Sequence, residues 1–311
     1  MVAQYFGAKK KEELSYAVGT CMVLTLIASL FMMVLGTAVS APMLRMLGTP
    51  EETYDMCVSY MQIIFLGIAG GGFYNILSGV LRGLGDSMSA LKYLVIAALL
   101  NIVLDLVFVA QFNMGVAGVA IATDLAQFIS AGLCAWKLFA MRDVMHLQRK
   151  HFGFHRDYAM QLVRLGLPSG LSQAVMSCSA LVVQSLPNSF GAVFVACNTI
   201  VMRVDGFVMM PNFSFGNAMT TFTGQNIGAG RMDRVVEGEK SGLKLAVGTA
   251  VVLVVCILLA GPVLMGLFTD TQSLIDMSNR MMRIIALGYI AFAVTQCMGG
   301  VMRGAGDTTT P

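Results

Sequence analysis

The chain has 311 residues, of which 57% are hydrophobic and only 12% are charged, and its mean hydropathy is +0.75. A soluble domain is about one-quarter charged, so this composition excludes an ordinary soluble protein and indicates a polytopic membrane protein. The net charge of +3 does not point to a nucleic-acid partner, because the basic residues lie between the apolar stretches. No nucleophile–base arrangement and no metal-ligand spacing among the cysteines is visible, so we expect neither an enzyme nor a cofactor.

Apolar runs of at least about 18 residues recur along the whole chain, and each is long enough to cross a bilayer as a helix. Glycine and proline clusters separate these runs and predict the loops between them. The pattern predicts an all-α protein with eight helices, at residues 14–39, 55–80, 88–110, 116–140, 158–186, 194–224, 241–268 and 274–300.

One phrase occurs twice, as GVLRGLGD from Gly79 and as GVMRGAGD from Gly300. The arginines of the two copies, Arg82 and Arg303, are 221 positions apart (303 − 82). The segment AQYFGA, with its glutamine at Gln4, matches GQNIGA with its glutamine at the same offset. A long shared register of this kind is the mark of an internal duplication.

The duplication also predicts helices beyond both ends of this chain. Within the second copy two spans precede GQNIGA, but within the first copy none precedes AQYFGA. Likewise, two spans follow GVLRGLGD within the first copy, but none follows GVMRGAGD within the second. We therefore expect twelve helices in two six-helix bundles related by a pseudo-twofold axis along the membrane normal, with about eight present here. The expected parts are an amino-terminal lobe (1–140), a cytoplasmic linker (141–157) and a carboxyl-terminal lobe (158–311), and we expect these residues alone not to transport.

Basic residues set the expected orientation, because they accumulate on the cytoplasmic side. Sixteen of the twenty lysines and arginines fall on the side of the RGxGD turns and of residues 141–157, and three fall on the other side. We expect a multi-pass protein of a plasma membrane with these loops in the cytoplasm. The three histidines lie in the linker at irregular spacing, which favours solvated loop residues over a metal site.

Charged groups at membrane depth are expensive, so each is a hypothesis of function. Asn101 and Asp105 share one helical face, and Thr123 and Asp124 reach a similar depth in the next, antiparallel span. The oxygens of an amide, of carboxylates and of a hydroxyl would together bind Na⁺, with the ion at Asp105. The same surroundings would equally suit a buried carboxylic acid that takes up and releases a proton. A helix–helix hydrogen bond is the alternative role for Asp105, and Asp124 could instead face groups across the bundle.

Two further charges, Arg203 and Asp205, are two positions apart and point to different sides of their helix. A structural pairing with other helices and a gating or substrate role both remain open for them. The RGxGD turns are expected to be structural, with glycines in tight turns and the charged residues at helix ends. These turn residues are Arg82, Gly83, Gly85 and Asp86, and Arg303, Gly304, Gly306 and Asp307.

Taken together, the motifs resemble those of the multidrug and toxic compound extrusion (MATE) transporters. The resemblance rests on Gln-x-x-Gly-Ala at Gln4 and Gln225, on the RGxGD turns, and on NIVLD from Asn101 followed by GVAGVAIAT from Gly115. It implies a two-lobe antiporter, monomeric when full length and bacterial, that exports amphiphilic compounds in exchange for Na⁺ or H⁺. Asn101, Asp105 and Thr123 match the amino-terminal cation site of one branch of the family.

The resemblance also shows a departure and leaves alternatives. Other branches place acids on the seventh and tenth helices, where this chain has Gln173 and Phe292, which argues against a cation site in the carboxyl-terminal lobe. Gln173 remains a candidate for gating or substrate contact. The wider superfamily includes flippases of lipid-linked precursors and polysaccharides, which are the alternative function, and an inactive truncated fragment is a third.

Overall fold

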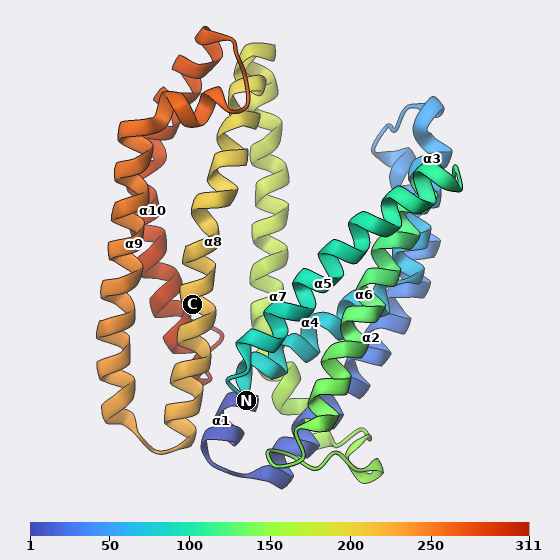
Figure 1. The fold of residues 1–311 in the computed structure, drawn as a ribbon, viewed down its shortest axis with the longest axis vertical. Helices are drawn as coiled ribbons and strands as arrows, with labels where there is room; N and C mark the ends of the chain where they lie inside the picture. Colours follow the sequence, from blue (N-terminus) through green and yellow to red (C-terminus); the bar gives the residue numbers. More distant parts are fainter. Residues whose placement is uncertain (311) are drawn as a thin grey trace. The chain divides into compact units, whose positions relative to one another are not determined.

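The computed structural model describes residues 1–310, apart from the side chains of Leu181, Gln184, Ser185 and Asn188. In this part of the chain the regular structure is helical throughout (Figure 1). The helices are α1 (Val2–Gly7), α2 (Lys11–Met46), α3 (Glu51–Leu66), α4 (Ile68–Gly83), α5 (Ser87–Leu106) with the π-helical turn η1 (Val107–Gln111), α6 (Gly115–Ala140), the short η2 (Arg149–His151), α7 (Arg156–Ser185), η3 (Leu186–Phe190), α8 (Ala192–Gly228), α9 (Met232–Gly266) and α10 (Gln272–Ala305).

Six described helices are long and apolar enough to cross a membrane: α2, α5 with η1, α6, α8, α9 and α10. The pair α3 and α4 makes a seventh candidate span, bent by 46° at the break between them. The expectation of a polytopic all-α protein is therefore confirmed. Each expected span overlaps one helix, except that the span expected at 55–80 is divided between α3 and α4. The helix α7, with 30 residues, is not among the candidate spans that the described residues provide.

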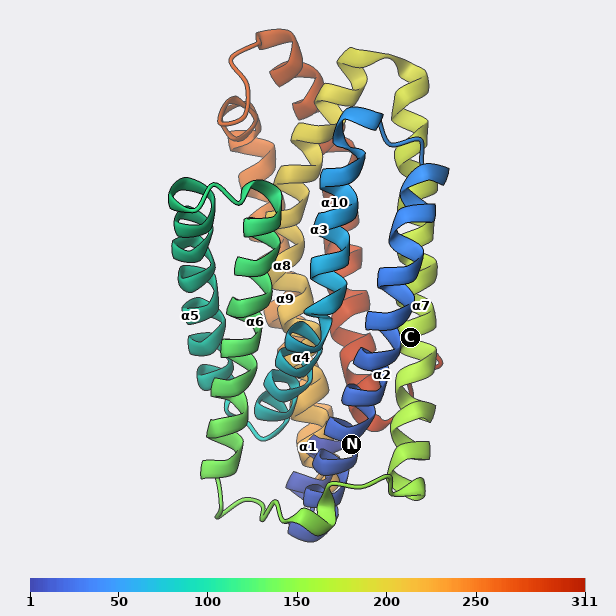
Figure 2. The same cartoon turned by 90° about the vertical axis from the view of Figure 1, so that its right-hand side faces the viewer.

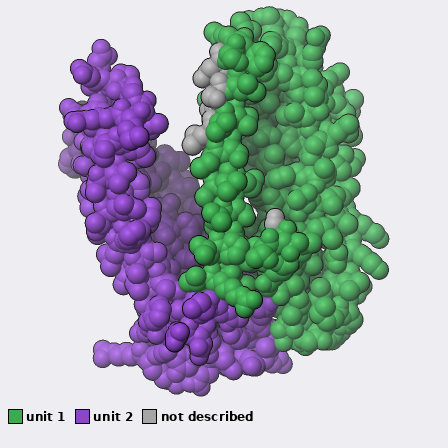
Figure 3. Space-filling view, turned by 180° about the vertical axis from the view of Figure 1, so that it is seen from behind, with its two compact units in different colours: residues 1, 163–311 green, residues 2–162 purple. Residues whose placement is uncertain are grey.

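The chain divides into two compact units: residues 2–162, called the first unit (purple, labelled unit 2 in Figure 3), and residues 163–311 with Met1, called the second unit (green, labelled unit 1). In the first unit, α6 packs against α4 and α5, and α2 packs against α3 and α4. Its hydrophobic core lies where α2, α4 and α6 meet, with Leu14, Leu77, Leu81 and Leu138 almost fully buried. The linker adds Met145 to this core. The linker therefore packs as part of the first unit.

In the second unit α8 and α10 pack together along their length, and α9 covers both of them. A Cβ at Gly300 would overlap the carbonyl oxygen of Gly216, and a Cβ at Gly304 would lie 2.7 Å from the carbonyl oxygen of Thr220. The backbones of α8 and α10 thus touch at two successive turns of α10. Small residues at such a GxxxG spacing allow membrane helices to approach this closely.

Both RGxGD turns have the same backbone. Gly85 and Gly306 adopt φ of +89° and +103°, the left-handed conformation that glycine reaches without steric strain. The next residue in each copy closes the turn, because the N–H of Asp86 donates to the carbonyl of Leu81 at 2.9 Å and that of Asp307 to Met302 at 3.0 Å. This is the hydrogen-bond pattern of a Schellman helix end.

The first glycine of each motif differs from the expectation of a turn residue. Gly83 is the last residue of α4, and Gly304 lies inside α10. A Cβ at Gly83 would lie 3.1 Å from the Val2 side chain of α1, so both glycines serve close helix packing.

The helix ends after the two QxxGA motifs also correspond. Lys9 and Gly230 both have positive φ, +57° and +71°. The N–H of Lys10 donates to the carbonyl of Tyr5 at 3.1 Å, and that of Arg231 donates to Asn226 at 2.8 Å. Both residue pairs keep the 221-residue offset (230 − 9 and 231 − 10), so the local structure carries the repeat that the sequence indicates.

The repeat fails at one position. Gly67 separates α3 from α4, whereas its repeat partner Gly288 lies inside the continuous helix α10. At the break, the Gly67 N–H donates to Ile63 and the Gly70 N–H donates to Gly67, at 3.0 and 2.9 Å. The first copy of this span is therefore bent where the second copy is continuous.

Candidate functional site

The side chains of Asn101 and Thr123 link α5 to α6 (Figure 2 shows the two helices side by side). The Asn101 amide donates to Thr123 Oγ1 at 3.4 Å, and Thr123 Oγ1 donates to the Val119 carbonyl at 2.9 Å. The predicted contact between these two candidate residues is thus present. The Asn101 Oδ1 atom is left as an acceptor for another donor or a cation.

Asp105 lies one turn further along α5 from Asn101, on the same face. Its Oδ1 atom is fully buried and has no hydrogen-bond partner among the described residues. A buried acceptor without a partner costs about 1–3 kcal/mol, which a proton or a cation would relieve. The π-helical turn η1 follows two residues later, and such turns are frequent at functional sites.

Asp124 faces a different element. Its carboxylate lies against Gly67, and a Cβ at that glycine would overlap the carboxyl group. The break between α3 and α4 therefore lies directly beside the Asp124 carboxylate. The amino-terminal end of α4 begins at this point and favours a negative charge. Next to it, a Cβ at Gly70 would lie 3.0 Å from the Phe128 ring, so α4 and α6 are in close contact here.

Arg203 and Asp205 point apart, as their spacing predicts. Arg203 is exposed on its unit, whereas Asp205 accepts a hydrogen bond of 2.6 Å from the Tyr289 hydroxyl of α10. Tyr289 is 2% exposed and is part of the core between α8 and α10. The geometry therefore gives Asp205 a structural partner on α10.

The second unit contains a cavity of about 400 Å³ between α7, α8 and α10. Gln173 and Phe292 both line it, and the described residues that line it include no carboxylate. Its polar lining is formed by Ser169, Ser172, Gln173, Asn217, Thr295, Gln296, Arg303 and Thr308. The Phe213 and Phe292 rings meet edge to face with centroids 5.5 Å apart, so the cavity combines aromatic and amide surfaces.

The turn residues have structural contacts. Asp86 accepts from the Ser89 N–H at 3.0 Å and caps α5, and its carboxylate lies 3.6 Å from the Lys137 ammonium. Burial alone would raise the pKa of Asp86, but the hydrogen bonds from Ser89 and the Lys137 charge outweigh it and lower the pKa. In the second copy, hydrogen bonds from Thr310 and Thr309 lower the pKa of Asp307 to about 2.

The two arginines of the motif differ. Arg82 lies 3.4 Å from the Ser78 hydroxyl and is exposed, whereas Arg303 is half-buried and lines the cavity of the second unit. The sequence therefore predicts the shared backbone of the two turns but not this difference between the arginines.

The donor set at α5 and α6 consists of oxygens from a carboxylate, an amide and a hydroxyl. This all-oxygen chemistry suits a hard cation such as Na⁺, or a proton on the carboxylate, better than a soft metal that prefers sulfur or imidazole ligands. Among the described residues, no group of three or more His, Cys, Asp or Glu side chains could hold a metal ion.

Three residues that sequence reasoning missed shape these sites. Tyr289 pairs with Asp205 across 84 positions, and no local pattern signals such a contact. Gly67 stands out in the sequence only as a repeat position that pairs with Gly288, and nothing in the sequence signals its contact with Asp124. His151 was expected to be solvated, but it is 2% exposed.

The fold and the α5–α6 oxygen cluster define a polytopic helical membrane protein with an internal repeat and ionisable groups within its spans, which is the class of secondary transporters. The family model MatE matches residues 1–107 and 168–311. The chain belongs to this family, the MATE transporters.

Several relatives are similar over most of the chain. "Probable multidrug resistance protein YoeA" of Bacillus subtilis is 26% identical, over 100% of this chain and 69% of the relative. "Probable multidrug resistance protein YpnP" of the same organism is 30% identical, over 87% of this chain and 60% of its own length. "Probable multidrug resistance protein NorM" of Thermotoga maritima is 28% identical over 84% and 57%. The chain thus spans roughly three-fifths to two-thirds of these relatives.

Solved structures share the fold. A MOP-superfamily transporter from Pyrococcus furiosus matches with a TM-score of 0.91 and 25% identity, covering 99% of this chain and 69% of that one. A MATE protein in complex with MaL6 matches with a TM-score of 0.92 at the same identity and coverage.

Proposed function

We propose that this chain forms part of a secondary antiporter that exports amphiphilic compounds in exchange for Na⁺ or H⁺. The observation that carries the proposal is the buried Oδ1 of Asp105, which has no partner in the described part of the chain and lies one turn from the Asn101–Thr123 contact. A cation or proton at Asp105 would complete this polar cluster. Binding there would bias the transporter towards one of its two states by differential affinity.

The position of Asp124 is a second observation that supports the same proposal. Its carboxylate lies at the Gly67 break, so a change in its charge would act on the bend between α3 and α4. We place Asp105 as the coupling acid, with Asn101 and Thr123 as its polar neighbours and Asp124 as an acid linked to the bend. Whether Na⁺ or H⁺ is exchanged is the question that the cation dependence of transport answers.

The substrate proposal rests on the cavity of the second unit, where aromatic rings and neutral amides could hold an amphiphile. We assign Gln173 a substrate-contact role there. Relatives that carry multidrug-resistance names favour drug-like substrates. The proposed location is the plasma membrane of a bacterium, with the RGxGD turns in the cytoplasm and a monomeric full-length protein.

One observation keeps the flippase alternative open. Arg303 is the one charged side chain among the described residues that line the cavity, and a guanidinium suits the phosphate of a lipid-linked precursor. A transport assay in vesicles with a fluorescent isoprenoid diphosphate would show flipping, whereas an antiporter would move a soluble amphiphile such as ethidium.

The experiment for the antiporter proposal is ethidium efflux by the full-length protein, driven by a Na⁺ or H⁺ gradient. Asp105→Asn should reduce the rate at least tenfold, because the neutral amide cannot bind and release the coupling cation, while membrane insertion is retained. Asp276→Asn, an exposed acid of α10, is the matched control and should keep the normal rate. Full efflux by Asp105→Asn would remove Asp105 from the coupling mechanism.

A further inference from the structure

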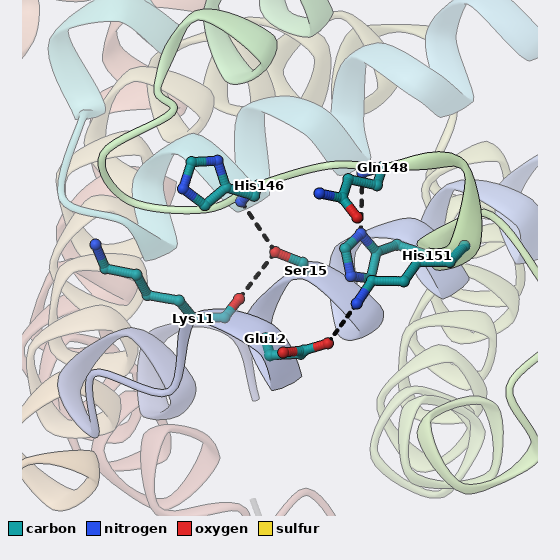
Figure 4. A pocket seen from close by; sticks show the side chains of 7 residues that line it. Lys11, Glu12, Ser15, His146, Gln148 and His151 are labelled. Atoms are coloured by element: carbon teal, nitrogen blue, oxygen red, sulfur yellow. Dashed lines mark hydrogen bonds and ion pairs between the residues drawn. The ribbon is translucent and has the colours of Figure 1, made fainter.

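The linker between α6 and α7 is fastened to the amino-terminal end of α2 by side-chain contacts (Figure 4). The His146 N–H donates to Ser15 Oγ at 3.2 Å, and the Lys11 ammonium donates to the Asp143 carbonyl at 2.5 Å. Lys150 and Glu12 form an ion pair of 2.6 Å across the same junction. These contacts surround a pocket of about 220 Å³.

His151 is deeply buried at this junction. It is 2% exposed, and its backbone lies so close to α2 that a Cβ at Gly19 would overlap the His151 carbonyl. Its ring meets the Tyr16 ring edge to face, with the centroids 4.6 Å apart. Burial on this scale is unusual for a side chain of an exposed loop and indicates specific docking.

The hydrogen bonds of His151 fix its protonation state. The Gln148 N–H donates to His151 Nδ1 at 2.9 Å, and a backbone N–H can only donate, so Nδ1 carries no proton in this arrangement. Its Nε2 atom is fully buried and has no partner among the described residues. The docked arrangement therefore requires a neutral imidazole. A second proton would remove the Gln148 bond and place a charge in a buried site.

We propose that the linker docks on α2 only while His151 is neutral, and that protonation of His151 on cytoplasmic acidification releases it. The charged and titratable groups that face His151 determine the pH at which its protonation releases the linker. On the linker these are Lys150 and the half-buried His155, whose ring lies 4.7 Å from that of Tyr16. On α2 they are Glu12 and Tyr16.

The pKa of His151 is lowered mainly by burial and further by the positive charge of Lys150, and the Glu12 carboxylate opposes this only in part. The docked form thus binds fewer protons than the released form. The docking constant has its full value well above the ordinary histidine pKa of about 6.5, is halved at that pH, and approaches a tenfold fall for each pH unit below it, until the lowered pKa is reached.

Release of the linker would also loosen the start of α7. Tyr158 stacks on Tyr16 with centroids 5.7 Å apart, and the Tyr5 hydroxyl donates to Gln161 at 3.0 Å. The first turn of α7 is therefore held by the same aromatic cluster that encloses His151. Because α7 is one continuous helix from Arg156 to Ser185, releasing the linker also frees the beginning of the helix that leads into the second unit.

Hydrogen exchange measured by mass spectrometry on the purified chain tests the proposal. Protection of the linker amides, corrected for the intrinsic pH dependence of exchange, should fall about fivefold between pH 6.5 and pH 5.5 and level off well above pH 7. In His151→Asn the amide oxygen replaces Nδ1 as an uncharged acceptor, so protection should stay high at both pH values. Gly19→Ala should remove protection at every pH, because its methyl group displaces the linker.

Two controls test whether His151, and not another histidine, causes the pH dependence. His146→Asn changes an exposed side chain and should keep the pH dependence of the natural protein. The chain has three histidines, so ¹³C-labelled histidine NMR should show the His151 resonance titrating at lower pH than the other two. Linker protection that is independent of pH, an unchanged fall in His151→Asn, or a His151 resonance that titrates at the ordinary pKa would each overturn the proposal.

Discussion

The glycine contact between α8 and α10 makes a quantitative prediction. In Gly300→Ala, the new methyl group would overlap the Gly216 carbonyl oxygen and lie 3.1 Å from the Gly216 Cα. Backbone atoms cannot rotate away as a side chain can, so the change should approach the upper end of overpacking, about 3 kcal/mol. Alanine also favours a helix over glycine by about 1 kcal/mol, which leaves a net loss of about 2 kcal/mol.

The matched variant is Gly288→Ala on the same helix, where a Cβ would meet no atom within 4 Å. It gains the helix propensity without the overlap, so it should be stabilised by up to about 1 kcal/mol. Thermal unfolding in detergent, followed by circular dichroism, should separate the two melting temperatures by about 6–12 °C, at about 2–4 °C per kcal/mol. A Gly300→Ala protein that melts together with Gly288→Ala would refute the close helix contact.

Three further changes test other parts of the account. Tyr289→Phe removes the hydrogen bond to Asp205 and should destabilise the second unit by about 1–3 kcal/mol in the same assay. Gly67→Ala should displace the Asp124 carboxylate and lower the efflux rate without changing any charged residue. Asp86→Ala removes the cap of α5 and should lose about 0.5–2 kcal/mol above pH 5. Because the pKa of Asp86 is lowered on folding, its contribution is present above the ordinary carboxyl pKa and is lost as the pH falls through the lowered one.

For each of these three substitutions, a control variant or a defined outcome would contradict the expected effect. Asp205→Asn keeps an acceptor for the tyrosine hydroxyl, so equal losses for it and Tyr289→Phe would argue against this hydrogen bond. Gly71→Ala adds a methyl group where no atom lies within 4 Å, and it should transport normally. If Asp86→Ala were as stable as the natural protein at pH 7, the capping role would be wrong.

The sequence predicts the parts of the fold that depend on local pattern. Long apolar runs predict the spans, and the 221-residue register predicts that Gly85 and Gly306 share a turn geometry. Local signals mislead where packing decides. Pro42 lies beyond the span predicted at 14–39, yet it lies inside α2, four residues before the end of that helix, where it gives up its own backbone hydrogen bond.

The candidate site was predictable only in part. The contact of Asn101 with Thr123 follows from helix depth, because antiparallel neighbours meet at equal depth. The position of Asp124 at Gly67 depends on the bend between α3 and α4, and Gly288 in the second copy shows that the same residue type does not produce a bend by itself. The burial of His151 depends on the fit of the linker against Gly19, which no periodicity reveals.

The central claim is that Asp105 binds the coupling cation. Its most direct test is cation release from the purified protein in weak buffer when the exported substrate is added, with a pH indicator for protons and a Na⁺ electrode in parallel. The natural protein should release one kind of cation as substrate binds, and Asp105→Asn should release neither while still binding substrate. Equal release by the two proteins would contradict the claim.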